Sequence, residues 1–129
     1  MGKTLFEKIW DLHVIRETEP GLFLLAIDRI YLHDLCGAFS FQMLEQNGCA
    51  VLRPETVFAS PDHTLSTLPG RTGLDTPESR AVLPRLRQGC QKYGVTLMDV
   101  GDPGQGIIHI VGPEQGRSLP GMTLLCGDS

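Results

Sequence analysis

Short apolar runs alternate along this chain with segments that place apolar residues at helical spacing, and this alternation limits the fold more than any other feature. Four apolar runs predict strands, at 22–32, 51–59, 95–100 and 122–126. The segments between them that fit helices are 38–46 and 76–93. Strands and helices in this order are typical of a layered α/β domain in which helices flank a largely parallel sheet.

Two further predictions about helices depend on a few individual residues. Thr4 and Glu7 have the spacing of a capping box, in which each side chain bonds the backbone of the other, so we expect a helix over 4–13. Pro84 lies inside the segment 76–93 and lacks the amide hydrogen that a helix interior uses. We therefore expect Pro84 to kink or split that helix.

The composition is that of an ordinary globular protein. With 129 residues the chain is long enough for one domain, and 41% of its residues are hydrophobic and 20% are charged. The net charge of −4 argues against nucleic acid as a partner. We expect no signal peptide in MGKTLFEKIW, and the longest apolar stretch, 22–27, is too short to cross a membrane. These features predict a cytoplasmic protein.

Four cysteines are scattered without the close spacing of metal-binding pairs: Cys36, Cys49, Cys90 and Cys126. In a cytoplasmic chain such cysteines are expected to be reduced and buried as small apolar residues. A metal site built from these four alone is therefore not expected.

The segment 101–106 reads GDPGQG and follows a predicted strand, so a phosphate-binding loop has to be considered. Dinucleotide-binding and Walker loops have a different pattern and open a helix, whereas IIHIV at 107–111 is typical of a strand. We interpret 101–106 as a tight turn that needs glycine for its backbone angles.

Polar residues occur at the ends of apolar runs, or within one, at three places: Asp62-His63, His109 and Asp128-Ser129. The carboxyl ends of parallel strands lie at one edge of a sheet, so these residues could meet in one crevice. An aspartate beside a histidine can fix the tautomer of the imidazole, as general acid–base catalysis requires. The residues alone leave plainer alternatives open, namely a solvated loop, a hydrogen-bonded core histidine and a frayed terminus. The other two histidines are interpreted as structural: His13 and His33.

Three stretches resemble the aconitase family and, within it, the large subunits of the isopropylmalate dehydratases: KTLFEKIWDLHVI at 3–15, FASPDH at 58–63 and LMDVGDPGQGIIHIVGPEQGRSLPGMTLLCGDS at 97–129. The resemblance runs along the whole chain, and the last stretch is long enough to be specific. It implies that 1–129 is the amino-terminal part of an aconitase-type α/β catalytic domain, incomplete at its carboxyl end and inactive by itself.

The resemblance also implies a reaction. The enzyme would be a hydro-lyase that isomerises 2-isopropylmalate to 3-isopropylmalate through 2-isopropylmaleate, in leucine biosynthesis. Such enzymes use a [4Fe-4S] cluster as a Lewis acid, with ligands outside this chain, and a small subunit that closes the site. One alternative is an aconitase-family isomerase of another 2-hydroxy di- or tricarboxylic acid, since Phe39 stands where relatives commonly have a substrate-binding glutamine. The other is a truncated, non-catalytic domain that only binds.

By the same resemblance, individual residues receive roles. Asp62 and His63 match a pair that donates a proton to the departing hydroxyl group. His109 matches a second active-site histidine, and Asp128 matches the carboxylate that pairs with it. Ser129 matches a residue that binds a substrate carboxylate, and none of the four cysteines matches a cluster ligand.

Overall fold

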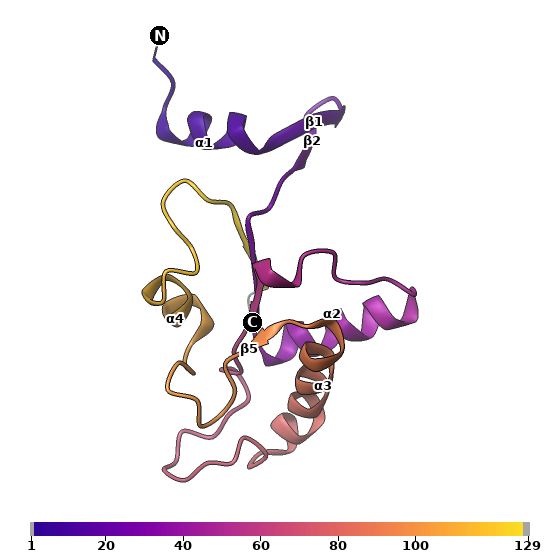
Figure 1. Ribbon diagram of the computed structural model, residues 1–129, viewed down its shortest axis with the longest axis vertical. Helices are drawn as coiled ribbons and strands as arrows, with labels where there is room; N and C mark the ends of the chain where they lie inside the picture. Colours follow the sequence, from indigo (N-terminus) through magenta and orange to yellow (C-terminus); the bar gives the residue numbers. More distant parts are fainter. Residues whose placement is uncertain (1, 128–129) are drawn as a thin grey trace.

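The central sheet consists of parallel strands, and the computed structural model describes the chain over residues 2–127 (Figure 1). Across the sheet the order is β5 (Thr96–Leu97), β4 (Val57–Ala59), β3 (Arg29–Leu32) and β6 (Leu124–Cys126). Each neighbouring pair in this order is parallel. The predicted α/β architecture with a largely parallel sheet is therefore confirmed, and a 3-10 turn at Pro54–Thr56 shortens the strand expected over 51–59.

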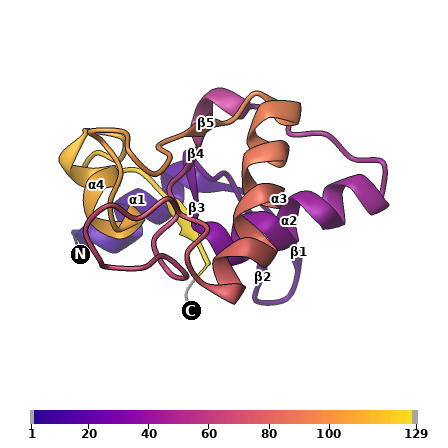
Figure 2. The ribbon, with the colours of Figure 1, turned by 90° about the horizontal axis from the view of Figure 1, so that it is seen from below.

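Helices cover both faces of this sheet. α2 (Asp34–Gln46) and α3 (Pro77–Tyr93) pack against each other on one side, and the short α4 (Ile108–Glu114) lies on the other (Figure 2). Successive residues of a strand point to opposite faces. In β3, Leu32 accordingly belongs to the core shared with α2 and α3, whereas Tyr31 belongs to the core shared with α4.

The contact between α2 and α3 is close because a glycine lies in it. A Cβ atom at Gly89 would lie 2.1 Å from Cδ2 of Phe41, so a larger residue would force the helices apart. α3 runs without interruption through Pro84, and the expected split does not occur. Pro84 faces solvent, while Leu83 and Leu86 are fully buried in the core. Packing of those leucines holds the helix together where one backbone hydrogen bond is missing.

The amino-terminal part of the chain forms a separate substructure. α1 (Leu5–His13) begins with the predicted capping box between Thr4 and Glu7. It leads into an antiparallel hairpin of β1 (Val14–Glu19) and β2 (Leu22–Leu25), which stands apart from the central sheet (Figure 1). The single strand predicted over 22–32 is therefore wrong, because the run is divided between β2 of the hairpin and β3 of the sheet.

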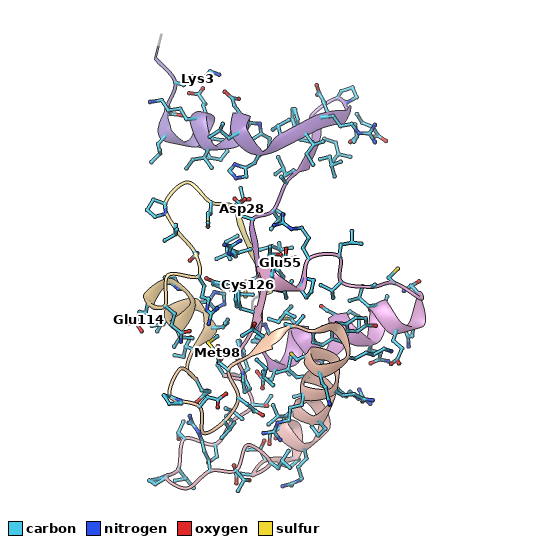
Figure 3. All side chains as sticks on the ribbon, viewed as in Figure 1. Lys3, Asp28, Glu55, Met98, Glu114 and Cys126 are labelled. Atoms are coloured by element: carbon cyan, nitrogen blue, oxygen red, sulfur yellow. The ribbon has the colours of Figure 1, made fainter. Side chains whose placement is uncertain are left out.

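Asp28 lies at the point where the hairpin passes into the sheet (Figure 3). Its Oδ2 atom is 2.7 Å from Nε2 of His13 and accepts a hydrogen bond of 2.9 Å from the backbone amide of Thr123. The pKa of His13 is raised by its bond to the carbonyl of Ile9 and by Asp28. The pKa of Asp28 is lowered, chiefly by the Thr123 amide. Asp28 thus ties the end of α1 to the start of β6, which agrees with a structural role for His13.

Two further expectations concern membranes and cysteines. Within residues 2–127, no helix has both the length and the apolar character needed to cross a membrane. None of the four cysteines is in a disulfide. Cys90 is buried as expected, but Cys49 is exposed and the other two are partly buried, so the expectation of buried cysteines is correct for Cys90 alone.

Candidate active site

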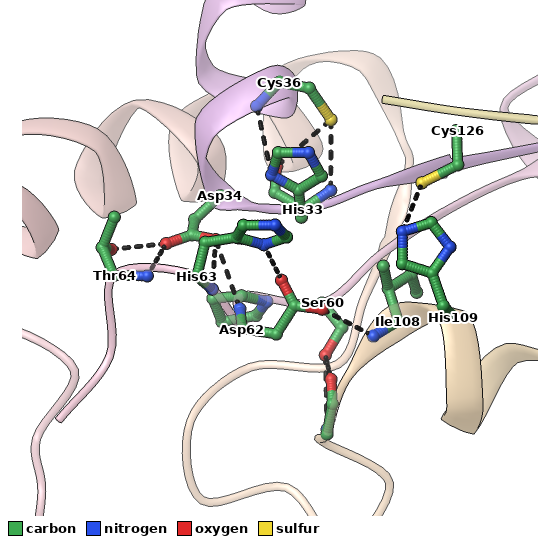
Figure 4. A network of polar contacts seen from close by, with 12 residues as sticks. His33, Asp34, Cys36, Ser60, Asp62, His63, Thr64, Ile108, His109 and Cys126 are labelled. Atoms are coloured by element: carbon green, nitrogen blue, oxygen red, sulfur yellow. Dashed lines mark hydrogen bonds and ion pairs between the residues drawn. The ribbon is translucent and has the colours of Figure 1, made fainter. Parts of the chain in front are cut away.

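Polar side chains gather at the edge of the sheet where β3, β4 and β6 end (Figure 4). His33 directly follows β3, the segment 60–63 follows β4, and Gly127 follows β6. Since β3 lies between β4 and β6, the sequence segments that leave these three strands are neighbours in space. Of the three polar spots that were expected to meet, Asp62-His63 lies at this edge. Asp128 and Ser129 lie outside the described residues.

A buried carboxylate, that of Asp34, fixes the segment that carries His63. Asp34 is the first residue of α2 and is fully buried. Its Oδ1 atom accepts the backbone amides of Asp62 and His63 at 3.2 and 3.0 Å. Its Oδ2 atom accepts the amide of Thr64 at 2.8 Å and also the hydroxyl of Thr64. Burial opposes ionisation of Asp34, but these hydrogen bonds outweigh it and lower the pKa of Asp34.

Asp62 and His63 form a hydrogen-bonded pair. The Nδ1 atom of His63 lies 2.5 Å from Oδ1 of Asp62, whose side chain is only 3% exposed. The other carboxylate oxygen of Asp62 accepts the backbone amide of Ile108, at the start of α4, at 2.7 Å. A carboxylate next to Nδ1 favours the tautomer with hydrogen on that nitrogen, which leaves Nε2 as the nitrogen that can exchange a proton with a ligand.

His109 lies beside this pair, although the segment around it was predicted incorrectly. The strand expected over 107–111 is wrong, because these residues begin α4. Ile108 and Gly112, four residues apart, are the buried positions of that helix, and Gly112 lets the ring of Tyr31 approach closely. His109 is exposed, and its Nε2 atom lies 3.7 Å from Sγ of Cys126 at the end of β6 (Figure 4).

His33 is the functional candidate that the sequence did not indicate. It is the N-cap of α2, and its ring stacks on the ring of His63 with centroids 3.9 Å apart and planes 27° apart. Burial lowers the pKa of His33, and His63 lowers it further, so its imidazole is held neutral. The signal in the sequence is that His33 and Asp62-His63 each follow a predicted strand. That signal does not place them in one site, because the sequence does not say that the two strands are neighbours in the sheet.

The glycine-rich segment 101–106 is hydrogen-bonded to the residues that precede Asp62. The Ser60 hydroxyl donates to the carbonyl of Gly106 at 2.7 Å, and the amide side chain of Gln105 donates to the carbonyl of Pro61 at 2.8 Å. Gly101 has a φ of +96°, a backbone conformation that favours glycine. The segment is therefore a tight turn that holds the strand end before Asp62, as interpreted from its sequence.

The sequence was also compared with those of known proteins. Residues 7–129 match the model of the aconitase family (aconitate hydratase). The chain belongs to the aconitase family. Among its relatives is a protein from Cytophaga hutchinsonii named 3-isopropylmalate dehydratase large subunit, 43% identical over 129 residues. The Bradyrhizobium diazoefficiens protein named 3-isopropylmalate dehydratase large subunit 1 is 45% identical over 128 residues, and the large subunit from Bacteroides thetaiotaomicron is 43% identical over 126.

These aconitase-family relatives are much longer than the chain. The aligned residues make up 100%, 99% and 98% of this chain, in the order in which the relatives are given above. They make up only 28% of the Cytophaga protein and 27% of each of the other two. The chain therefore spans a little over a quarter of the length of the relatives that it matches.

The residues of this chain do not fit the iron–sulfur cluster that the aconitase family implies. In residues 2–127, the only convergent group of three or more possible ligands is His33, Asp34, Asp62 and His63, with ligand atoms within 4.8 Å of one another. It contains no cysteine, and its carboxylates are already engaged by backbone amides and by His63. Among the cysteines, burial raises the pKa of Cys90 to about 12, which opposes the thiolate that iron requires.

Proposed function

We propose that this chain supplies the acid–base residues of a dehydratase that converts 2-isopropylmalate to 3-isopropylmalate through 2-isopropylmaleate, in leucine biosynthesis. The observation that carries this proposal is the Asp62–His63 pair, held at the carboxyl edge of a parallel sheet in a chain whose relatives bear the dehydratase name. Residues 1–129 would be the amino-terminal part of the catalytic domain of a longer large subunit.

His63 has the central role in this proposal. During dehydration its Nε2 atom donates a proton to the departing hydroxyl group, while a base outside residues 1–129 takes the proton from the neighbouring carbon. During rehydration that base returns a proton to carbon, and His63 takes one from the attacking water. Asp62 keeps the ring in one tautomer and stabilises the imidazolium while it exists. His109 would act as the second active-site histidine with Asp128 as its partner, and Ser129 would bind a substrate carboxylate.

Other components of the reaction come from outside these residues. The described residues offer no set of cysteine ligands for the cluster. We propose that its ligands lie in the longer subunit and that a small subunit, implied by the relatives' names, completes the site around the hydroxy-acid substrate. The biosynthetic role favours the cytoplasm as the place of action.

A different substrate is the second candidate, and one observation favours it. Phe39, which is 65% exposed, stands where the resemblance places a substrate-binding glutamine. A phenyl ring cannot donate the hydrogen bond that a glutamine donates at this position in the resemblance. An aconitase-family isomerase with a different 2-hydroxy acid would retain the Asp62–His63 chemistry and differ in the groups around it.

The test is a substitution of His63 in the full-length large subunit together with its small subunit. His63→Gln should lower kcat about 100- to 10,000-fold, because the proton donor is lost. The visible absorbance of the cluster should be unchanged, since no ligand is touched. His13→Gln, which removes an imidazole from the α1 connection, is the matched control. Turnover of the His63 variant at the level of this control would refute the proposal, and turnover of another 2-hydroxy acid in preference to 2-isopropylmalate would favour the second candidate.

A further inference from the structure

Two histidine rings from different parts of the chain are stacked in the candidate site. The ring of His33 comes from the N-cap of α2, and the ring of His63 from the segment after β4 (Figure 4). Their centroids lie 3.9 Å apart, and His33 is only 1% exposed. The resemblance that assigned roles to other residues assigns none to His33, so its place against His63 needs an explanation.

An ordinary core histidine would be held by hydrogen bonds at both ring nitrogens. In His33, Nδ1 accepts the backbone amide of Cys36 at 3.4 Å, but buried Nε2 has no hydrogen-bond partner among residues 2–127. Leaving a buried nitrogen in this state costs free energy. The close contact of this ring is the stacking of its face on the face of His63.

His33 is also part of the structure that fixes the chain around His63. Its backbone amide donates to Sγ of Cys36 at 3.3 Å, so the first turn of α2 holds His33 in place. The next residue, Asp34, binds the amides of residues 62–64. The stacking ring and the carboxylate that anchors the opposite segment therefore come from two consecutive residues of one helix end.

Two contacts of the His63 ring, with Asp62 and with His33, restrict different movements. The hydrogen bond between Nδ1 and Asp62 fixes the position of that nitrogen. A single hydrogen bond still lets the ring rotate about the axis of the bond. The face of His33 blocks that rotation from one side. Together the two contacts restrict both the tilt of the imidazole and the direction in which its Nε2 atom points.

We propose that His33 is a positioning residue, whose ring face sets the plane of His63 and so aims the Nε2 atom of His63 at the reacting hydroxyl group. This inference rests on the proposed function for the direction of the proton transfer, but the stacking itself does not. His33 takes no proton in this role, and it can be replaced by another flat ring.

The charges around His33 are consistent with a neutral ring. The groups that act on it are His63 and His109, which disfavour its protonation, and Asp62 and Asp34, which favour it. Burial decides the balance toward the neutral form. A neutral ring face can lie against His63 in both of its protonation states, whereas a charged His33 would repel an imidazolium at this distance.

Two substitutions separate stacking from helix capping. His33→Phe keeps a flat ring but removes the cap, and His33→Asn keeps a good N-cap but removes the ring. In the full-length enzyme with its small subunit, His33→Asn should lower kcat about 10- to 100-fold through misplacement of His63, with KM changed less than about twofold. His33→Phe should stay within about threefold of the unchanged enzyme. The reverse order, equal losses in both, or no loss in either would overturn the proposal.

A measurement on the 129-residue chain keeps the inference independent of turnover. Nitrogen-15 NMR of the imidazoles reports the tautomer and the mobility of the His63 ring. The unchanged chain and His33→Phe should show one fixed tautomer with hydrogen on Nδ1, and His33→Asn should show an averaged ring. A fixed His63 ring in His33→Asn would overturn the positioning role. If instead the NMR result holds and His63→Gln keeps full turnover, the proposed function fails and the stacking role stands.

Discussion

Replacement of Asp34 by asparagine tests how firmly the candidate site is anchored. The two side chains have nearly the same shape, but asparagine has one acceptor oxygen where aspartate has two. The Asp34 carboxylate accepts four hydrogen bonds, two at each oxygen. In Asp34→Asn, one pair of donors, either from residues 62–63 or from Thr64, would face an NH2 group instead of an oxygen.

The magnitude follows from these lost contacts. A hydrogen bond to a charged group contributes about 1.5–3 kcal/mol, so losing two of them costs about 3–6 kcal/mol. Relief from burying a charge offsets part of this loss, and we expect a net decrease of about 3 kcal/mol in the free energy of unfolding. A domain of this size has a total stability of about 5–15 kcal/mol, so the change is large.

Asp75→Asn is the matched control for this experiment. Asp75 accepts the amides of Thr72 and Gly73 and the hydroxyl of Thr72, a set of donors much like that of Asp34, but Asp75 is exposed. Water can satisfy the donors that Asp75→Asn releases, and the expected cost is within about 0.5 kcal/mol. Urea denaturation followed by circular dichroism measures both variants. Equal destabilisation of the two would refute the argument that burial gives the Asp34 contacts their weight.

The same experiment has a pH dependence with a definite sign. The pKa of Asp34 is lower in the folded chain than its ordinary value of 3.8. Its contribution to stability is therefore fully present above that value and is lost as the pH falls through the folded pKa. The difference in stability between the unchanged chain and Asp34→Asn should shrink in acid, and a difference that grows as the pH falls would contradict the assignment.

Three further predictions concern packing, thiol reactivity and the amino-terminal connection. Gly89→Ala should lower the free energy of unfolding by about 1–3 kcal/mol, because its Cβ atom would lie 2.1 Å from Phe41; an unchanged urea midpoint would argue against this close contact. A thiol reagent should modify the exposed Cys49 of the native chain quickly. It should modify Cys90 only after unfolding, because burial raises the pKa of Cys90 to about 12. Equal rates of modification by mass spectrometry would contradict this. The pKa of His13 is raised above 6.5 in the folded chain, so its contribution to stability is full below that value and is lost as the pH rises through the folded pKa. The difference in stability between the unchanged chain and His13→Gln should therefore decrease in alkali. An increase would contradict the sign.

Features that depend on neighbouring residues could be predicted from the sequence. The capping box is formed by Thr4 and Glu7, three residues apart, so its geometry is implied by their spacing. The parallel sheet followed from the alternation of elements. The same local reasoning failed at 107–111, where β-branched residues favour a strand, because packing of Ile108 under Tyr31 makes the segment helical.

The candidate site shows a similar division. Asp62-His63 could be found because both residues follow one apolar run. His33 and Asp34 were not recognised as part of the same site, because only the pairing of β3 with β4 brings them to the segment 62–64. A sequence does not state which strands are neighbours, so contacts between separate strand ends are the part of a site that it reveals least.

The position of His33 and Asp34 at one end of α2 has a consequence for how this region responds to change. A small displacement of the helix carries the ring and the anchoring carboxylate together, and with them the backbone that they hold. Substitutions in the residues packed around α2 should then move the two stacked imidazoles as one rigid piece. The bond from the amide of Ile108 to Asp62 joins that piece to α4, so substitutions in α4 should alter this bond before they disturb the histidine pair.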